Sequence, residues 1–200
     1  EYWATSAVGL PSAVPLGEVP AGFTDLNQSL DLFNSLYWNK QAMAEAPNDR
    51  ARATVTRWLV HNEGGYAPHA GGRAIAHSVK RPLENRVWYR YPGQPNANTI
   101  DSIPHPSQIA QMLADGSTQL QQYTYNTNGF VTSTSDPVGR QTTLAYAANN
   151  IDVLQISQTR PGGSDVLLTK SGFSSLHQPT TVTDAAGQAT TYTYNAAGQM

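Results

Sequence analysis

The sequence predicts a mainly β fold made of antiparallel β-hairpin repeats, with one helix near the N-terminus. After Glu84 the chain contains no glutamate and only one lysine, Lys170. Thr, Ser, Tyr, Asn, Gln and Gly fill this part instead, and such residues favour strands and turns over helices. Aromatic residues, Asp and Gly also recur there at fixed intervals, which indicates repeated strand-turn units.

Composition and charge exclude several classes of protein. The 200 residues carry a net charge of −2 with Lys and Arg thinly spread, so no basic patch for nucleic acid or an anionic membrane is present. No apolar run approaches the roughly 20 residues that a membrane-spanning helix needs. The absence of cysteine excludes disulfides and thiolate metal sites. Because the chain begins at Glu1 and stops at Met200 inside a repeat, we expect it to be a fragment.

Residues 1–53 are predicted to form an irregular Pro- and Gly-rich segment that contains a helix. The helix begins at Thr24 or Asp25, either of which can cap it, and fades by Pro47. Its apolar residues recur at three- and four-residue spacing, as one buried helix face requires. These residues are Leu26, Leu30, Phe33 and Tyr37.

Residues 54–116 are predicted to form a β region that precedes the repeats. Strand-forming runs begin near Thr54, at Arg73 and at Asn85, and they end at turns rich in Gly or Pro. The segment PSQIAQMLADGSTQLQQYTYN fits either a short helix followed by a strand or a hairpin that turns at Asp115-Gly116. The hairpin is favoured, because Asp-Gly between two alternating runs is a strong hairpin signal.

Residues 117–200 contain the repeats, and four aromatic residues mark three successive units. These residues are Tyr125, Tyr146, Phe173 and Tyr194. The first and third units are equally long, and the middle unit is longer. In the two shorter units an Asp stands at the same position after the first aromatic, a Gly stands at the third position after that Asp, and a Thr pair comes next. The matched pairs are Asp136 with Gly139 and Asp184 with Gly187.

The spacing fits a unit of strand, turn, strand and turn. DPVG and DAAG have Asp first and Gly last, as a type I turn prefers. NTNG and NAAG, which end in Gly129 and Gly198, supply the second turn, because Asn and Gly tolerate left-handed backbone angles. The longer middle unit contains an extra TRPGGSD, which predicts a longer turn.

Side chains two residues apart share one face of a strand. Tyr192 and Tyr194 therefore share a face, and Leu144 and Tyr146 repeat this arrangement. Stacked Tyr and Leu side chains from successive units would bury a continuous stripe, whereas a single hairpin is marginal in water. We expect each unit to depend on its neighbours.

Four segments carry a resemblance to a known family. YNTNGFVTSTSDPVGRQTTLAYAANNIDVLQI and PTTVTDAAGQATTYTYNAAGQM resemble Rhs repeats, also called YD repeats. The likeness extends through SQIAQMLADGSTQLQQYTYN and KRPLENRVWYRYPGQ, which are similar to bacterial Rhs proteins in particular. It covers residues 54–200 well and the first quarter of the chain loosely.

The resemblance implies that the strands form part of a large curved sheet or hollow shell around a C-terminal toxin domain. Proteins of this family are polymorphic toxins or casing subunits of insecticidal toxin complexes. The implied partners are the rest of the same shell, its toxin domain and components of a secretion apparatus. The implied location is outside the producing cell or on its surface, after export by a specialised secretion system. Family members also cleave themselves at a core motif, which these 200 residues do not match.

We expect no catalytic, cofactor-binding or metal-binding residue in this sequence and no enzyme activity within it. Asp136 and Asp184 are interpreted as structural turn residues, since their matched places in two turns explain both. The five histidines lack the spacing of metal ligands. No phosphate-binding loop or hydrolase elbow is recognisable either. A toxin activity would lie outside these residues.

The alternative function is an extracellular β module that binds surface carbohydrate or another cell. Trp88, Tyr89 and Tyr91 could stack on sugar rings from an exposed strand. Exposure of these rings would favour this function, and burial would weaken it.

Overall fold

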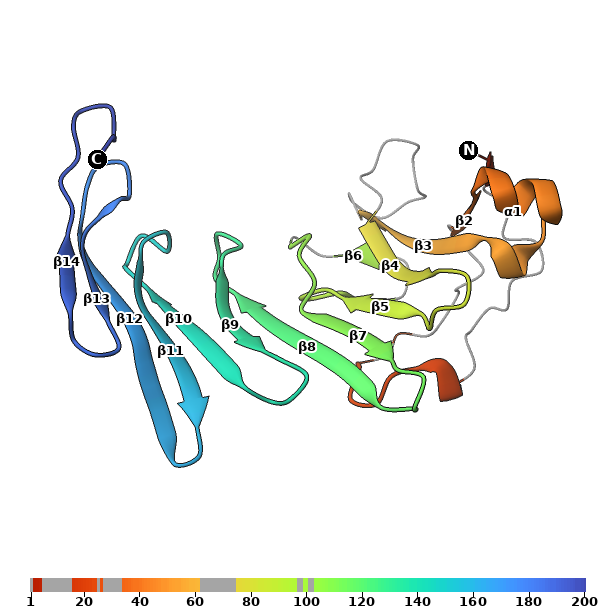
Figure 1. Ribbon diagram of the computed structural model, residues 1–200, viewed down its shortest axis with the longest axis horizontal. Coiled ribbons are helices and arrows are strands. Elements are labelled where there is room, and N and C mark those ends of the chain that lie inside the picture. Colours follow the sequence, from red (N-terminus) through yellow and green to blue (C-terminus); the bar gives the residue numbers. More distant parts are fainter. Residues whose placement is uncertain are drawn as a thin grey trace. The chain divides into compact units, whose positions relative to one another are not determined.

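The computed structural model is mainly β and divides into two compact units, Glu1–Gln121 and Gln122–Met200 (Figure 1). It describes residues 2–4, 16–24, 26, 34–61, 75–96, 99–100 and 103–200. Antiparallel hairpins dominate both units, and α1, Lys40–Glu45, is the one α-helix among the described residues. The predicted fold class is confirmed, while the predicted region boundaries at residues 53 and 116 stay predictions.

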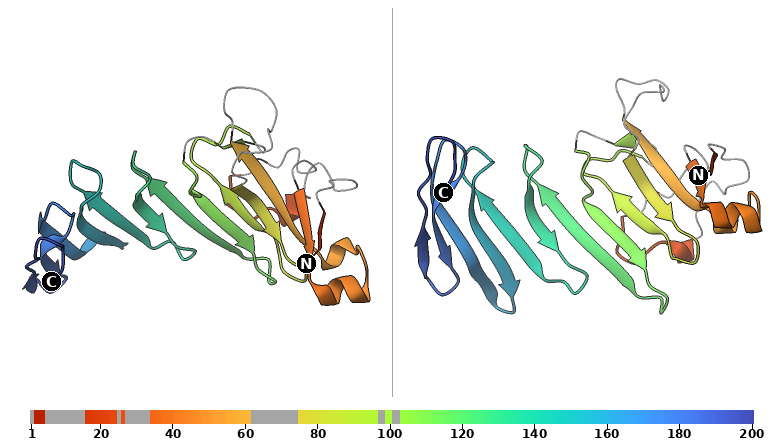
Figure 2. Two further views of the ribbon diagram at one scale, coloured as in Figure 1. Left: turned by 90° about the horizontal axis from the view of Figure 1, so that it is seen from above. Right: turned by 45° about the horizontal axis from the view of Figure 1, so that its top comes forward.

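In unit one the strands follow one another through the sheet nearly in chain order (Figure 2). The order is β1-β2-β3-β4-β5-β7-β8, and the pairs from β1–β2 to β5–β7 are antiparallel. β6 pairs with β3 in parallel, outside this series. The strands are β1 (Tyr2–Ala4), β2 (Asn34–Trp38), β3 (Thr54–His61), β4 (Ile75–Lys80), β5 (Val87–Arg90), β6 (Thr99–Ile100), β7 (Gln108–Met112) and β8 (Thr118–Tyr125), of which β8 continues into unit two. Two 3₁₀ helices, η1 (Leu16–Glu18) and η2 (Arg50–Arg52), complete it.

The strands predicted from the sequence in unit one are confirmed by β3, β4 and β5. The hairpin predicted at Asp115-Gly116 is confirmed by the turn between β7 and β8, where the Leu113 amide donates to the Ser117 carbonyl at 2.7 Å. Gly116 has a φ of 83°, a backbone angle that glycine adopts without steric cost.

The helix predicted from Thr24 to Pro47 is confirmed only at α1, and the prediction is wrong for residues 34–38, which form β2. Asn34, Leu36 and Trp38 are buried there and alternate with half-buried residues, and this two-residue alternation is that of a strand. Tyr37, assigned from the sequence to a helix face, pairs with β3 instead. The predicted helix residues Leu30 and Phe33 lie outside the described residues.

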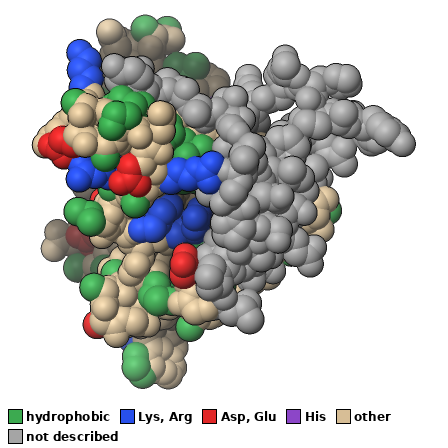
Figure 3. Space-filling model, turned by 90° about the vertical axis from the view of Figure 1, so that its right-hand side faces the viewer, with side chains coloured by type: hydrophobic (Ala, Val, Ile, Leu, Met, Phe, Trp, Pro, Cys, Tyr) green, Lys and Arg blue, Asp and Glu red, His purple; other side chains and the backbone are tan. Residues whose placement is uncertain are grey.

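α1 is short because signals at both of its ends confine it. The Asn39 side chain accepts a hydrogen bond from the Ala42 amide, which caps the first turn. Pro47 lies two residues beyond the last helical residue and cannot continue the helix. On the surface seen in Figure 3, basic and acidic side chains lie close together. Arg52 forms ion pairs with Glu45 and Asp49 near α1.

Unit one has a hydrophobic core on its sheet. Leu59 and Tyr91 are 0% and 4% exposed and pack together. Trp88, also 0% exposed, contacts Phe23 at 5.9 Å between ring centroids. The segment that carries Phe23 is tied to the sheet by the Ala21 amide, which donates to the Thr118 hydroxyl at 3.0 Å. This covering segment gives unit one a second layer over part of its sheet.

Unit two is a meander in which every strand pairs with the preceding one in antiparallel fashion. After β8, its strands are β9 (Val131–Ser135), β10 (Gln141–Tyr146), β11 (Val153–Arg160), β12 (Gly163–Phe173), β13 (Pro179–Asp184) and β14 (Ala189–Thr191). All of its residues are described, and none of its apolar side chains is buried; its buried residues are Asp152 and Ser157. Unit two therefore has no hydrophobic core of its own.

The prediction that TRPGGSD forms a longer turn is wrong. Arg160 pairs directly with Gly163, so Pro161 and Gly162 form a tight turn between the two strands. Gly162 has a φ of 82°, which suits the third position of a type II turn after a proline. The extra residues lengthen β11 and β12 instead. Among the helices that the structure describes, none is long and apolar enough to cross a membrane.

We predict that Leu59→Ala lowers the free energy of unfolding of unit one by about 2–5 kcal/mol, because it leaves a cavity in the core. Leu83→Ala is the matched control, since Leu83 is 105% exposed and its change should stay within about 0.5 kcal/mol. Chemical denaturation of the two variants measures both effects. Equal losses would contradict the placement of the core.

Candidate functional site

The turns of unit two repeat one pattern of hydrogen bonds. In DPVG, the Gly139 amide donates to the Asp136 carbonyl at 2.9 Å, which closes the turn. The Asp136 carboxylate accepts hydrogen bonds from the amides of Val138 and Arg140, both at 3.0 Å. The Asp136 amide in turn donates to the Arg140 carbonyl at 3.0 Å. These bonds tie both strand ends to the turn tip, so the turn fixes the register of the two strands.

Three more turns have the same hydrogen bonds. They begin at Asn126, Asp184 and Asn195, whose side-chain oxygens accept from the amides two and four residues later at 2.8–3.0 Å. Each ends in a glycine with φ between 77° and 85°, as in the Asp136 turn; these glycines are Gly129, Gly139, Gly187 and Gly198. This is a type I turn followed by a left-handed residue, a common hairpin connection. The sequence-predicted turn residues therefore occupy equivalent places.

Two further turns have a left-handed residue other than glycine and escaped the sequence analysis. One runs from Ala147 to Asp152 and is one residue longer, with a φ of 56° at Asn150 and with Asn149 Oδ1 as the acceptor of the amide hydrogen bonds. The other runs from Ser174 to His177, with a φ of 62°, and the Ser174 hydroxyl accepts the two amide hydrogen bonds at 3.2 and 3.3 Å. Asn at the left-handed position is a usable signal, because Asn tolerates such angles. The Ser-to-His turn offers no comparable signal.

The tyrosine hydroxyls form a second recurring link. Tyr146 donates to the Val131 carbonyl at 2.7 Å, and Tyr194 donates to the Pro179 carbonyl at 2.9 Å. In both cases the acceptor lies 15 residues earlier, so the second link repeats the first at a later place in the chain. The Phe130 ring also stacks on Tyr146 with a centroid distance of 6.3 Å. The hydroxyl and the ring together join the end of β10 to the start of β9, at the open end of the β9–β10 hairpin.

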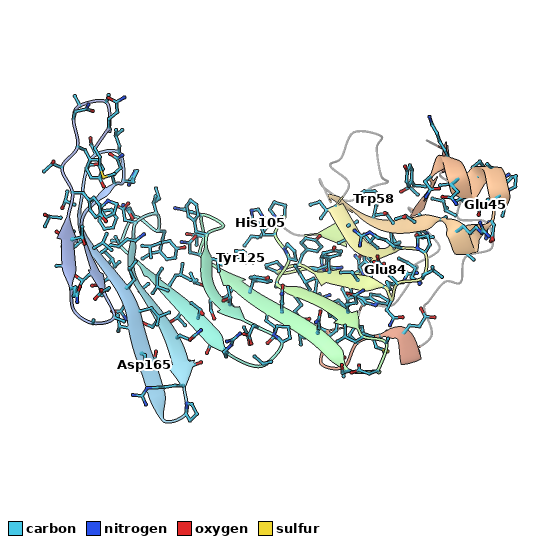
Figure 4. The ribbon with its side chains drawn as sticks, viewed as in Figure 1. Glu45, Trp58, Glu84, His105, Tyr125 and Asp165 are labelled. Atoms are coloured by element: carbon cyan, nitrogen blue, oxygen red, sulfur yellow. The ribbon has the colours of Figure 1, made fainter. Side chains whose placement is uncertain are left out.

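The other two aromatic markers also lie at the ends of strands. Tyr125 lies at the end of β8 (Figure 4), and burial raises the pKa of its hydroxyl. Phe173 ends β12 half-buried and has no hydroxyl to donate. The same kind of link occurs in unit one, where the Tyr91 hydroxyl donates at 2.7 Å to the carbonyl of Ala76, 15 residues earlier. Part of the repeat geometry is thus present before residue 117.

Side chains join the turns that lie at one end of the strands in unit two. Asn126 Nδ2 donates to the Asn150 carbonyl at 2.9 Å, and Gln178 Nε2 donates to the Gly198 carbonyl at 2.7 Å. Between these pairs, His177 Nδ1 lies 3.0 Å from Asp152 Oδ1. Four successive turns at this end are therefore connected in series. The turns that contain Asp136, Gly139, Asp184 and Gly187 lie at the opposite end of the strands.

The predicted carboxylates are occupied by their own turns. Burial opposes the ionisation of Asp136, but hydrogen bonds from Arg140 and the turn amides lower its pKa. Arg140 Nε lies 2.6 Å from the second oxygen of this carboxylate. In the part of the chain that the structure describes, no group of three His, Asp or Glu residues could hold a metal ion. These contacts fit a structural role at the turn tip.

The aromatic residues considered for carbohydrate binding are largely enclosed. Trp88 is 0% exposed and Tyr91 is 4% exposed, while Tyr89 is half-buried. Stacking on a sugar ring requires an accessible ring face. The burial of Trp88 therefore weakens the alternative function.

We predict that Gly187→Ala lowers the free energy of unfolding of unit two by about 1–2 kcal/mol, because Ala is strained at a φ of 81° although space is open around it. Gly163→Ala in β12 is the control and should be neutral, because Gly163 has no such angle and only the Arg160 side chain lies nearby. Urea denaturation of both variants checks this. A neutral Gly187→Ala would show that the turn is not held in this conformation.

We also predict that Tyr146→Phe lowers the free energy of unfolding by about 0.5–1.5 kcal/mol through loss of the hydrogen bond to the Val131 carbonyl. Tyr192→Phe should change it little, because the Tyr192 hydroxyl makes no hydrogen bond within unit two, all of whose residues are described. Hydrogen exchange of the β9 and β10 amides localises the effect. Equal effects of the two changes would count against the tyrosine link.

Comparison with known proteins gives one family match and several similar solved structures. Residues 173–200 match the model of the RHS repeat family. No curated protein matches the sequence. The structure of TcdB2-TccC3-Cdc42 is similar with a TM-score of 0.43 at 12% identity, over 73% of this chain and 9% of that chain. A Photorhabdus luminescens Tc holotoxin pore has a TM-score of 0.40 at 13% identity, over 75% of this chain and 9% of that chain.

The matched region coincides with the repeat geometry at the end of unit two. It begins at Phe173, includes the turn at Asp184 and Gly187, and contains the Tyr194 link. The present chain spans about 9% of the length of the solved chains that it resembles. Residues 173–200 match the RHS repeat family, which confirms the family resemblance seen in the sequence for this part of the chain.

Proposed function

We propose that this chain is a segment of an RHS-repeat shell, a structural and non-enzymatic wall that encloses a toxin domain and helps to deliver it. The observation that carries the proposal is the recurrence of one turn and one tyrosine link at equivalent places in unit two. Such repetition builds a long sheet from equal modules, and the RHS repeat at residues 173–200 supports this origin.

The burial pattern of unit two supports a wall in preference to a self-contained domain. None of its apolar side chains is buried, and the large apolar side chains of Leu154, Val166 and Leu167 are 38–42% exposed. A single sheet with no covering layer is marginally stable unless further strands or a second layer adjoin it. The proposed partners are accordingly the rest of the same shell and the enclosed toxin domain. Export of the full-length protein is part of this proposal.

In the proposed function, the shell acts by enclosing the toxin domain. A closed wall leaves no free sheet edge for aggregation and no access for proteases. The enclosed domain would be held away from the producing cell until the shell opens. In this function the Tyr, Asp and Gly residues of the repeats act by fixing the spacing of the strands.

Limited proteolysis of the full-length protein tests the proposal. We predict that the region following the repeats resists protease while the shell is intact. The double change Tyr146→Ala and Tyr194→Ala removes two links and should expose that region to cleavage. Tyr192→Ala serves as the control and should preserve protection. Rapid cleavage of that region in the unaltered protein would contradict enclosure.

A further inference from the structure

A β-bulge in β4 brings two neighbouring polar side chains into the interior of unit one. Arg57 of β3 pairs with Ser78, and the next residue, Trp58, pairs with Ala76. His77 is therefore the extra residue of the bulge. His77 and Ser78 are 1% and 0% exposed. Bulges of this kind re-aim side chains and are frequent next to functional sites.

Strand β5 adds basic side chains to the same face. Trp88 pairs with Ser78, so both lie on one face of the sheet. Arg86 and Arg90 are two residues before and after Trp88 and share its face by the period of a strand. Arg86 Nη1 donates to the Ser78 hydroxyl at 3.0 Å, and the Arg86 guanidinium carbon lies 5.7 Å from the Trp88 ring centre. The Trp88 ring meets the edge of the His77 ring at a centroid distance of 5.8 Å.

The four side chains of this basic cluster, His77, Arg86, Trp88 and Arg90, present buried nitrogen atoms without a partner. His77 Nδ1, Arg86 Nε, Trp88 Nε1 and Arg90 Nη1 make no hydrogen bond with any described residue. No ion pair joins Arg86 or Arg90 to an acidic side chain among the described residues. Glu18 acts on Arg86 only at longer range.

The charge of the cluster is not balanced by described residues. Burial lowers the pKa of both Arg86 and Arg90 because it removes water from their charged forms, and the charge of Glu18 offsets this only in part for Arg86. Burial, together with the charges of Arg57, Arg86 and Arg90, lowers the pKa of His77 to about 3, so this ring is neutral near pH 7. Buried charges without counter-charge and buried donors without acceptors are both costly.

We propose that this basic cluster is a binding site for an oxyanion of the phosphate or sulfate class. Trp88 and the two guanidiniums can only donate hydrogen bonds, and neutral His77 can donate from Nδ1 in one tautomer. The complementary ligand therefore offers only acceptors and carries negative charge. A tetrahedral oxyanion meets both requirements, and guanidinium groups bind it through parallel N–H donors.

Water and metal cations fit this cluster less well than an oxyanion. One water molecule accepts too few hydrogen bonds for four donors and leaves the charge of two arginines uncompensated. A cation would be repelled by the same charges. Arg86 and Arg90 are half-buried, so part of each side chain contacts solvent although its unpartnered nitrogen is buried. The inference stands on unit one alone and is independent of the proposed function.

Thermal unfolding in millimolar sodium phosphate or sodium sulfate, against sodium chloride at equal ionic strength, tests the site. We expect both oxyanions to raise the unfolding temperature of the chain, with a saturable dependence on concentration that yields a Kd. Low concentrations are essential, because molar phosphate and sulfate stabilise proteins in general. Arg90→Gln should weaken the Kd by about tenfold or more, because it removes a charge-assisted hydrogen bond.

Arg81→Gln is the matched control, since Arg81 lies exposed between β4 and β5 and pairs with Glu84. It should leave the Kd for phosphate unchanged. In buffer without oxyanions Arg90→Gln should unfold at the same or a higher temperature than the unaltered chain, because it removes an uncompensated charge. This readout separates loss of a ligand from loss of folding.

Two outcomes would overturn the proposal. Absence of any saturable oxyanion effect on the unaltered chain would mean that the cluster is already neutralised within the chain. An equal effect on the unaltered chain, Arg90→Gln and Arg81→Gln would place the binding elsewhere.

Discussion

The left-handed turn residue, together with the side chain that accepts the turn amides, is the constraint on which unit two depends. Without a buried apolar core, hydrophobic burial cannot set the register of the strands there. The turns take over this role, because the hydrogen bonds of each turn hold the adjoining strands in one alignment. Gly139 and Gly187 supply the required angle at one end of the strands, and Gly129 and Gly198 supply it at the other.

Side-chain hydrogen bonds between neighbouring strands and between neighbouring turns extend this local order along the sheet. Tyr146 and Tyr194 reach back 15 residues to a backbone carbonyl, and side chains such as Asn126 and Gln178 join successive turns. Every link connects neighbours in the chain, so a unit can be added without altering earlier ones. This is the arrangement expected of a repeat protein whose role is to form an extended, curved surface. Unit one differs, because Leu59 and Trp88 give it a conventional core.

The sequence predicts what local chemistry determines and misses what depends on longer-range pairing. The Asp-x-x-Gly and Asn-x-x-Gly turns were predictable, because those residues favour the observed angles on their own. The turn ending at His177 was not, since a non-glycine left-handed residue leaves no compositional signal. β2 was mistaken for helix because the spacing from Leu26 to Tyr37 fits a helix face. Pairing with β3 decided its conformation instead.

The basic cluster is a second feature that could not be predicted from the sequence. Its residues belong to β4 and β5 or lie next to them, and in the sequence they resemble scattered surface charges. A one-residue bulge at His77 helps to bring them together, and no sequence pattern predicts this bulge. Electron cryo-microscopy of the full-length protein tests the central claim most directly. The account predicts a closed β wall in which further units repeat the turn and tyrosine link of this segment around interior density. An open sheet with solvent on both faces of unit two would contradict it.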